Sequence, residues 1–200
     1  MALTVLRVES LTTTLGQAVS LALASGEILG IRGASGCGKS LLLRALVDLD
    51  LNTGEVWLDN RARSTIPAHQ WRRQVGLLPA ESHWWSDRVG DHFPKLLWPD
   101  EWLSQLGLNQ EALSWSVNRL SSGERQRLAL LRLLASRPNV LLLDEPTANL
   151  DGETTLNVEK ILLDLRQDQQ IPMIWVSHDP NQLARVADRV LVMEAGGFIS

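Results

Sequence analysis

Residues 33–40 are the part of this sequence that most constrains how the chain can fold. They read Gly-Ala-Ser-Gly-Cys-Gly-Lys-Ser and fit the pattern G-x-x-x-x-G-K-[ST], whose glycines let successive backbone N–H groups point at a polyphosphate. The apolar run 27–32 before them predicts a strand. Residues 41–47 after them predict a helix, whose dipole adds positive charge at the same point. A glycine-rich turn that merely joins strand to helix would not require the Gly-Lys-Ser ending.

The motif assigns chemistry to individual side chains. In such loops the lysine reaches the β- and γ-phosphates and the hydroxyl ligates the accompanying magnesium ion, which are the roles predicted for Lys39 and Ser40. Cys37 is the only cysteine, so it forms no internal disulfide, and we expect it to serve as a small loop side chain. The predicted nucleotide-binding set is Gly33, Ala34, Ser35, Gly36, Cys37, Gly38, Lys39, Ser40 and Leu41.

Composition narrows the class of protein. The 200 residues suffice for one buried core with a small appended subdomain, and the net charge of −4 offers no electrostatic footprint for nucleic acid, so no nucleic-acid partner is expected. No apolar run approaches the roughly 18 residues that span a bilayer, and the N-terminus lacks the pattern of a signal peptide. We therefore expect a cytoplasmic location.

The order of predicted elements indicates an α/β fold. Apolar runs that predict strands alternate with helical patterns along most of the chain, which is typical of a mainly parallel sheet flanked by helices. Residues 140–143 are four apolar residues in a row, the mark of a strand buried on both faces. From about residue 81 the pattern changes to short helical stretches punctuated by Pro94 and Pro99, which we interpret as a helical insertion.

Two adjacent carboxylates end the apolar strand. Asp144 and Glu145 fall at the carboxyl edge of a parallel sheet, where such sheets bind ligands. An aspartate there can hold magnesium, and the next carboxylate can orient and deprotonate an attacking water. Taken alone, the pair could equally be a helix-capping aspartate followed by a solvated glutamate.

Three further motifs establish a family resemblance. Residues 120–124, Leu-Ser-Ser-Gly-Glu, followed by Arg-Gln-Arg and an apolar helix, resemble the signature motif of the ABC (ATP-binding cassette) ATPases. Residues 144–151, Asp-Glu-Pro-Thr-Ala-Asn-Leu-Asp, resemble the acidic strand and D-loop of that family, and residues 177–179, Ser-His-Asp, resemble its switch histidine. The motifs occur in family order over essentially the whole chain.

The resemblance implies a fold and a division of the chain. It implies one ABC ATPase domain over residues 1–200, with a P-loop NTPase core at 1–80 and 137–200. The core would include an N-terminal antiparallel β portion, and a small α-helical subdomain with the signature motif would occupy about 81–136.

The resemblance also implies a composite ATP site shared by two copies packed head to tail. Lys39, Glu145 and His178 of one copy would be catalytic, with magnesium at Ser40 and Asp144. Ser121, Ser122, Gly123 and Glu124 of the other copy would close over the γ-phosphate. His178 would hold the γ-phosphate and the base in register, and a satisfied core histidine is the alternative. Asp151 would signal across the dimer, cap the next helix, or both.

Three positions depart from the family pattern. The family's glutamine after strand 75–78 falls at Ala80, so either Glu81 supplies a metal ligand instead or the contact is missing. The family carries an aromatic residue that stacks on adenine near the position of Leu15. Leucine has no π-face, so we expect weaker discrimination of the base. Glu124 replaces the commoner glutamine, a mild change at a helix start.

The function implied is the ATPase subunit of an ABC transporter, working with a separate membrane subunit. A soluble ABC-type ATPase acting in DNA repair or translation and an ATP sensor without hydrolysis are the alternatives. Eight tryptophans are present, and five lie between residues 84 and 115. Trp84 and Trp85 suit docking onto the membrane partner about as well as they suit a polar surface loop, whereas we expect Trp98, Trp102 and Trp115 to form the core of the insertion.

Overall fold

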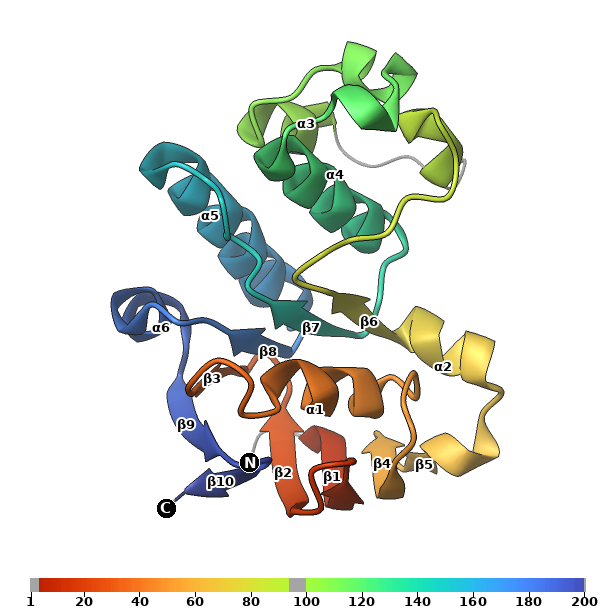
Figure 1. The fold of residues 1–200 in the computed structure, drawn as a ribbon, viewed down its shortest axis with the longest axis vertical. Helices are drawn as coiled ribbons and strands as arrows, with labels where there is room; N and C mark the ends of the chain where they lie inside the picture. The colour runs from red at the N-terminus through yellow and green to blue at the C-terminus, as the bar shows by residue number, and fades with distance from the viewer. Residues whose placement is uncertain (1–3, 94–99, 200) are drawn as a thin grey trace.

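The computed structural model describes residues 4–93 and 100–199. Figure 1 shows two sheets in the lower half of the molecule and a group of helices at its upper end. No helix among the described residues is both long and apolar enough to cross a membrane. The predicted α/β class with a P-loop NTPase core is confirmed, and the following elements place the functional residues.

The smaller sheet is antiparallel and lies at the N-terminus. Its strand order is β2-β1-β4-β5. Strand β2 alternates exposed and buried residues over most of its length, as expected for a sheet with one face on the core. The bounds are β1 Thr4–Thr12, β2 Ala18–Ala24, β4 Thr53–Leu58 and β5 Arg61–Ala62. The two-residue β5 was not predicted.

The larger sheet carries the nucleotide-binding motifs. Its order is β10-β9-β3-β8-β7-β6, and all neighbours are parallel except the hairpin of β9 and β10. All five residues of β7 are buried, as the unbroken apolar run predicted. The bounds are β3 Ile28–Arg32, β6 Val75–Leu78, β7 Val140–Asp144, β8 Met173–Val176, β9 Arg189–Glu194 and β10 Gly197–Ile199. Strand β10, only three residues long, was not predicted.

Helices cover both faces of the larger sheet. Leu142 of β7 belongs to the core cluster around α1, whereas Leu143 belongs to the cluster formed with α4, α5 and α6. In Figure 1, α1 lies between the two sheets, so its apolar side chains are enclosed. The bounds are α1 Lys39–Leu46, α2 Ala68–Gln74, α3 Asp100–Gln105, α4 Ser122–Ala135, α5 Gly152–Gln169 and α6 Pro180–Val186.

The upper group of helices is built from α3, α4 and short 3-10 turns at Val89–His92, Gln110–Ser114 and Val117–Arg119. Trp102 and Trp115 are partly buried against the core cluster formed with α4, α5 and α6. The guanidinium of Arg119 lies 4.0 Å from the Trp115 ring centroid. Trp98 falls outside the described residues. The division of the chain at residues 81 and 136 stays a prediction.

Candidate functional site

The glycine loop lies between β3 and α1 and can be made only with glycine at two points. A Cβ built on Gly33 would lie 2.3 Å from the carbonyl oxygen of Met193. Gly38 has φ of +108°, a backbone conformation that side chains oppose, and a Cβ there would lie 2.5 Å from Leu15 Cδ1. The loop therefore packs against its neighbours through its backbone.

The N-terminus of α1 is arranged to receive an anion. Gly38 is its N-cap and supplies no side-chain hydrogen bond, and the first turn contains no acidic residue. The Nζ of Lys39, a residue only 7% exposed, donates to the carbonyl oxygens of Gly33 (2.8 Å) and Ala34 (3.0 Å). Helix N–H groups and a lysine ammonium thus converge with no neutralising carboxylate in the loop.

Sheet pairing brings the other motifs to the same edge. Ile31 of β3 pairs with Val176 of β8, and Val176 pairs with Asp144 of β7. Because the three strands are parallel and adjacent, their carboxyl ends meet there. Asp144 is 5% exposed at the end of β7, and His178 follows β8 by two residues.

Glu145 is held in an unusual conformation. Its φ is +50°, a left-handed value that is uncommon for a non-glycine residue, and its N–H donates to the carbonyl of Val176 (3.1 Å). Its Oε1 is buried without a hydrogen-bond partner, and lies 3.6 Å from His178 Nε2, too far for a hydrogen bond. Burial is the main cause that raises the pKa of the Glu145 carboxyl; His178 and Lys39 partly offset this rise, and the nearby Asp144 adds to it.

These groups surround one cavity of about 270 Å³. Its lining consists of Ser35, Gly36, Gly38, Lys39, Ser40, Leu41, Ala80, Asp144, Glu145 and His178. Most of the predicted loop set and all three predicted catalytic residues are therefore brought together. Gly33, Ala34 and Cys37 do not line the cavity, and the Cys37 side chain is buried in the core cluster around α1.

Ala80 and Glu81 point to different places. Ala80 lines the cavity, whereas Glu81 lines a second hollow of about 300 Å³ together with Arg44, Arg72 and Leu133. Of the two alternatives left open by the sequence, neither is decided, and Ala80 is the residue that borders the cavity. Glu81 does not line the cavity that contains Lys39 and Asp144, and its role as a metal ligand stays a prediction.

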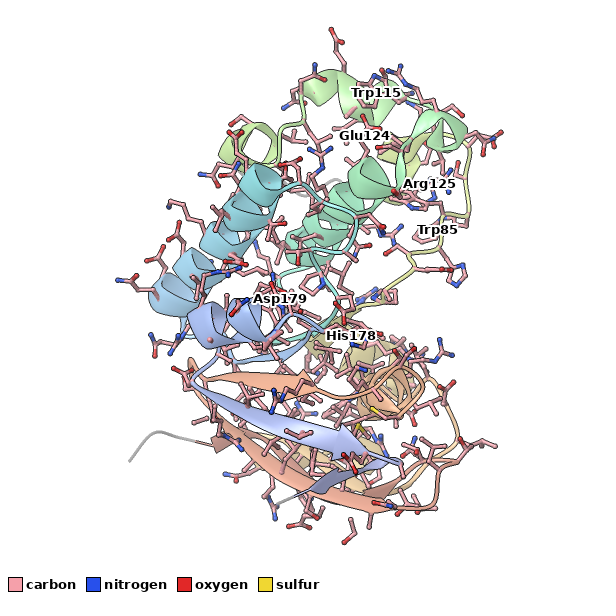
Figure 2. All side chains as sticks on the ribbon, turned by 60° about the vertical axis from the view of Figure 1, so that its left-hand side comes forward. Trp85, Trp115, Glu124, Arg125, His178 and Asp179 are labelled. Carbon is pink, nitrogen blue, oxygen red and sulfur yellow. The ribbon has the colours of Figure 1, made fainter. Side chains whose placement is uncertain are left out.

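The signature residues Ser121, Ser122, Gly123 and Glu124 do not line the cavity. Ser121 caps α4: its N–H and hydroxyl donate to Glu124 Oε2 (2.9 and 2.8 Å), and its Oγ accepts from the Glu124 N–H (3.2 Å). These bonds from Ser121 lower the pKa of the Glu124 carboxyl. Figure 2 shows Glu124 and Arg125 in the helical part of the molecule and His178 nearer the sheets.

Asp151 and Leu15 lie next to the sequence motifs. Asp151 caps α5 through a bond from the Thr154 N–H (2.8 Å), which confirms its local capping role. Leu15 is 41% exposed and packs beside Gly38 and Gly196, so it presents aliphatic surface next to the phosphate loop.

Sequence patterns missed one link to the site. The Gln126 side chain is 5% exposed, and its Nε2 donates to the backbone carbonyl of Glu145 (3.3 Å). It ties the helix that follows the signature motif to the residue with the unpartnered carboxylate oxygen. Its place just after the signature motif is the only signal the sequence offers for it.

Comparison with protein families places the chain. The model of the family described as ABC transporter matches residues 17–148. The aliphatic sulfonates import ATP-binding protein of Agrobacterium fabrum is 35% identical over 90% of this chain and 71% of its own length. The methionine import ATP-binding protein of Thermobifida fusca is 33% identical over 90% of this chain, which spans 61% of that relative.

A third relative matches over most of its own length. The lipoprotein-releasing system ATP-binding protein of Acinetobacter baylyi is 36% identical over 90% of this chain and 87% of its length. Among solved structures, a bacterial Atm1-family ABC exporter with ATP bound has a TM-score of 0.86 at 21% identity, over 98% of this chain and 38% of its own. An ATP-binding cassette dimer bound to ADP and phosphate has a TM-score of 0.81 at 23% identity, over 98% and 97% of the two chains.

Proposed function

The chain belongs to the ABC transporter family, and from this premise we propose that it is the ATP-binding and ATP-hydrolysing subunit of a transporter. The observation that carries the proposal is the single cavity in which Lys39, Asp144, Glu145 and His178 meet the glycine loop. Its lining supplies phosphate-binding N–H groups, a cation, and a carboxylate oxygen without a partner. Phosphoryl transfer needs little more than such positioning and electrostatic stabilisation.

The loop side of the cavity fits a magnesium triphosphate. The backbone N–H groups and Lys39 would bind the phosphate oxygens, and the Ser40 hydroxyl and Asp144 would ligate the ion. No cluster of three or more His, Cys, Asp or Glu side chains within the described residues is placed to hold a metal by itself, which suits magnesium held partly by phosphates and water. The ion would neutralise charge on the phosphates during transfer.

Glu145 is the group placed to activate water. Its Oε1 is desolvated and unpartnered, so an attacking water could donate a hydrogen bond to it and pass it a proton. Burial raises the pKa of Glu145, which makes it a stronger base than an exposed glutamate. The ring of His178, 3.6 Å from this oxygen, would orient the carboxylate and contact the γ-phosphate.

The remaining donors would come from a second copy. Ser121 is exposed and Gly123 only partly buried, and both lie outside the cavity of their own chain. Packed head to tail, each copy would place its signature residues over the γ-phosphate bound by the other. Splitting the donor set in this way couples hydrolysis to closure of the dimer.

A membrane subunit would dock at the second hollow. The hollow is lined by apolar side chains and by Arg44, Arg72 and Glu81, and the exposed Leu49 belongs to its rim. Arg72 donates only to the backbone carbonyls of Val47 and Asp48, so it has no carboxylate partner among the described residues. We assign the hollow to a cytoplasmic segment of the membrane subunit that carries apolar residues and an acidic one.

Trp85 would extend this docking surface. Its side chain is 73% exposed, and its ring is held by Arg132, whose guanidinium lies 5.1 Å from the ring centroid. Arg132 also donates to the carbonyl of His83, which lines the hollow. Figure 2 shows Trp85 on the outer side of the connection between the sheets and the helical part.

Two experiments test the proposal. Purified protein with ATP and magnesium should release phosphate. When Trp85→Ala and Leu49→Ala are combined, the protein should no longer co-purify with the membrane subunit. Val190→Ala, which also shortens an exposed apolar residue, is the matched control and should leave the complex intact. Absence of hydrolysis even with the membrane subunit would favour an ATP sensor, and salt-sensitive binding to DNA or RNA would favour a non-transport ATPase.

A further inference from the structure

A buried polar network lies behind the cavity and is not explained by nucleotide binding. Glu159 of α5 is 3% exposed, and Gln182 of α6 is 2% exposed. The Nε2 of Gln182 donates to Glu159 Oε1 (2.9 Å), and Arg185 Nη2 donates to the same oxygen (2.7 Å). Arg185 Nε donates to the other oxygen (3.1 Å).

Gln182 uses both of its N–H donors and its carbonyl oxygen in hydrogen bonds inside the protein. Besides its bond to Glu159, its Nε2 donates to the hydroxyl of Thr147 (2.8 Å). Its Oε1 accepts from the indole N–H of Trp175 (3.3 Å). An amide has two N–H donors and one carbonyl acceptor, so one side chain joins three separate elements with no orphaned hydrogen.

Thr147, Trp175 and Gln182 each lie close in sequence to a residue of the candidate active site. Thr147 follows Glu145 by two residues, and Trp175 lies on β8 three residues before His178. Gln182 follows His178 by four residues, on the seven-residue helix α6 that begins at Pro180 directly after the histidine loop. The network therefore connects the two strands whose following residues carry the carboxylate and the imidazole.

We propose that Gln182 is a positioning residue that holds His178 in register with Glu145. This inference rests on the proposed function, because register matters only if both groups act on one substrate. The 3.6 Å separation of Glu145 Oε1 and His178 Nε2 is set by elements that meet at the Gln182 amide. A shift of about 1 Å in reacting groups can reduce a rate by about a hundredfold, so loss of the amide should lower kcat more than nucleotide affinity.

The test compares substitutions at the two residues that donate hydrogen bonds to Glu159. Gln182→Leu removes the bonds to Thr147, Trp175 and Glu159, whereas Arg185→Gln removes only the bonds from a partly exposed guanidinium to Glu159. We expect Gln182→Leu to lower kcat at least about tenfold with the ATP Kd within about threefold, and Arg185→Gln to keep kcat within about twofold. Equal loss of kcat in the two variants at equal thermal midpoints would overturn the proposal.

A swapped pair separates positioning from folding. Gln182→Glu alone sets two carboxylates face to face and should be nearly inactive. Combining it with Glu159→Gln restores one amide and one carboxylate: the Thr147 hydroxyl can then act as donor, and the Arg185 guanidinium, which would face an amide N–H at position 159, must turn to the carboxylate at position 182. The double variant should recover kcat at least about tenfold above Gln182→Glu, whereas a double variant as inactive as Gln182→Glu would contradict the inference.

A spectroscopic measurement keeps this inference separate from the proposed function. If the parent protein does not hydrolyse ATP, the proposed function fails, and the position of His178 is then followed by NMR. The chain has four histidines, so the His178 ring signals can be assigned with a His178→Gln variant. They should shift in Gln182→Leu and stay unchanged in Arg185→Gln, and identical spectra for the two variants would refute positioning by Gln182.

Discussion

Glu145 Oε1 lies 3.6 Å from His178 Nε2 and accepts no hydrogen bond, although it is buried. An unpartnered carboxylate oxygen inside a protein is unfavourable, so its persistence needs a reason. The positive φ of Glu145 and its backbone bond to Val176 hold the side chain where it is. The oxygen borders the cavity that we assign to ATP, so the missing partner is best supplied by the attacking water.

Glu145→Gln should abolish hydrolysis and preserve ATP binding. The amide has nearly the shape of the carboxylate but cannot accept a proton, so we expect kcat to fall at least about a hundredfold. With hydrolysis blocked, ATP and magnesium should convert the variant into a dimer, which size-exclusion chromatography detects. Retention of more than about a tenth of the parent activity would exclude Glu145 as the general base.

The same substitution should stabilise the chain without nucleotide. Burial raises the folded-state pKa of Glu145, so the protonated form favours folding, and this contribution is lost as the pH rises through that pKa. At pH 7.5 the ionised carboxylate therefore destabilises the fold, and Glu145→Gln should raise Tm by about 1–3 °C. Below about pH 4, where unfolded glutamate is also protonated, the two proteins should melt together. A lower Tm for the variant at pH 7.5 would contradict the assigned shift.

The decline of kcat at low pH follows from the raised pKa of Glu145. A general base must be ionised, and burial raises the pKa of Glu145 above its ordinary value. The kcat of the parent should therefore decline at a higher pH than the ordinary glutamate value of about 4.3 predicts. Stopped assays between pH 4.5 and 8 at saturating ATP measure this decline, and a flat profile over that range would count against Glu145.

Contiguous patterns were the part of the site that the sequence predicted well. The loop at 33–40 forms between its flanking strand and helix because all three are adjacent in the chain. Asp144 and His178 follow strands whose parallel pairing brings their carboxyl ends together. The edge strands β5 and β10 were less predictable, since they are too short to show a periodicity.

Contacts between distant residues could not be predicted from a single sequence. Gln182 bonds Thr147, 35 residues away, and Glu159, 23 residues away, and a glutamine in a short polar helix gives no sign of burial. The choice between Ala80 and Glu81 likewise depends on how the chain leaves β6 after Pro79. One residue of difference sends the carboxylate to the second hollow.

Ala80→Gln should raise hydrolysis. Ala80 lines the cavity but offers no polar atom, and an amide there could bind the attacking water or the magnesium ion. One added hydrogen bond contributes about 0.5–1.5 kcal/mol, so kcat should rise about two- to tenfold. Glu81→Ala is the control and should keep kcat within about twofold because Glu81 lines the other hollow. Loss of hydrolysis in Glu81→Ala would instead support Glu81 as a ligand of the magnesium ion.

Leu15→Phe should tighten binding of ATP through its base. Leu15 packs beside Gly38 and Gly196 and presents aliphatic surface next to the phosphate loop, so the base finds no π-face there. Aromatic stacking contributes about 0.5–1.5 kcal/mol beyond burial, which predicts a two- to tenfold lower Kd for ATP. Inorganic tripolyphosphate is the control ligand, because it has phosphates and no base. Calorimetry should show its affinity unchanged, and a parallel gain for both ligands would mean that Leu15 acts on the phosphate loop and not on the base.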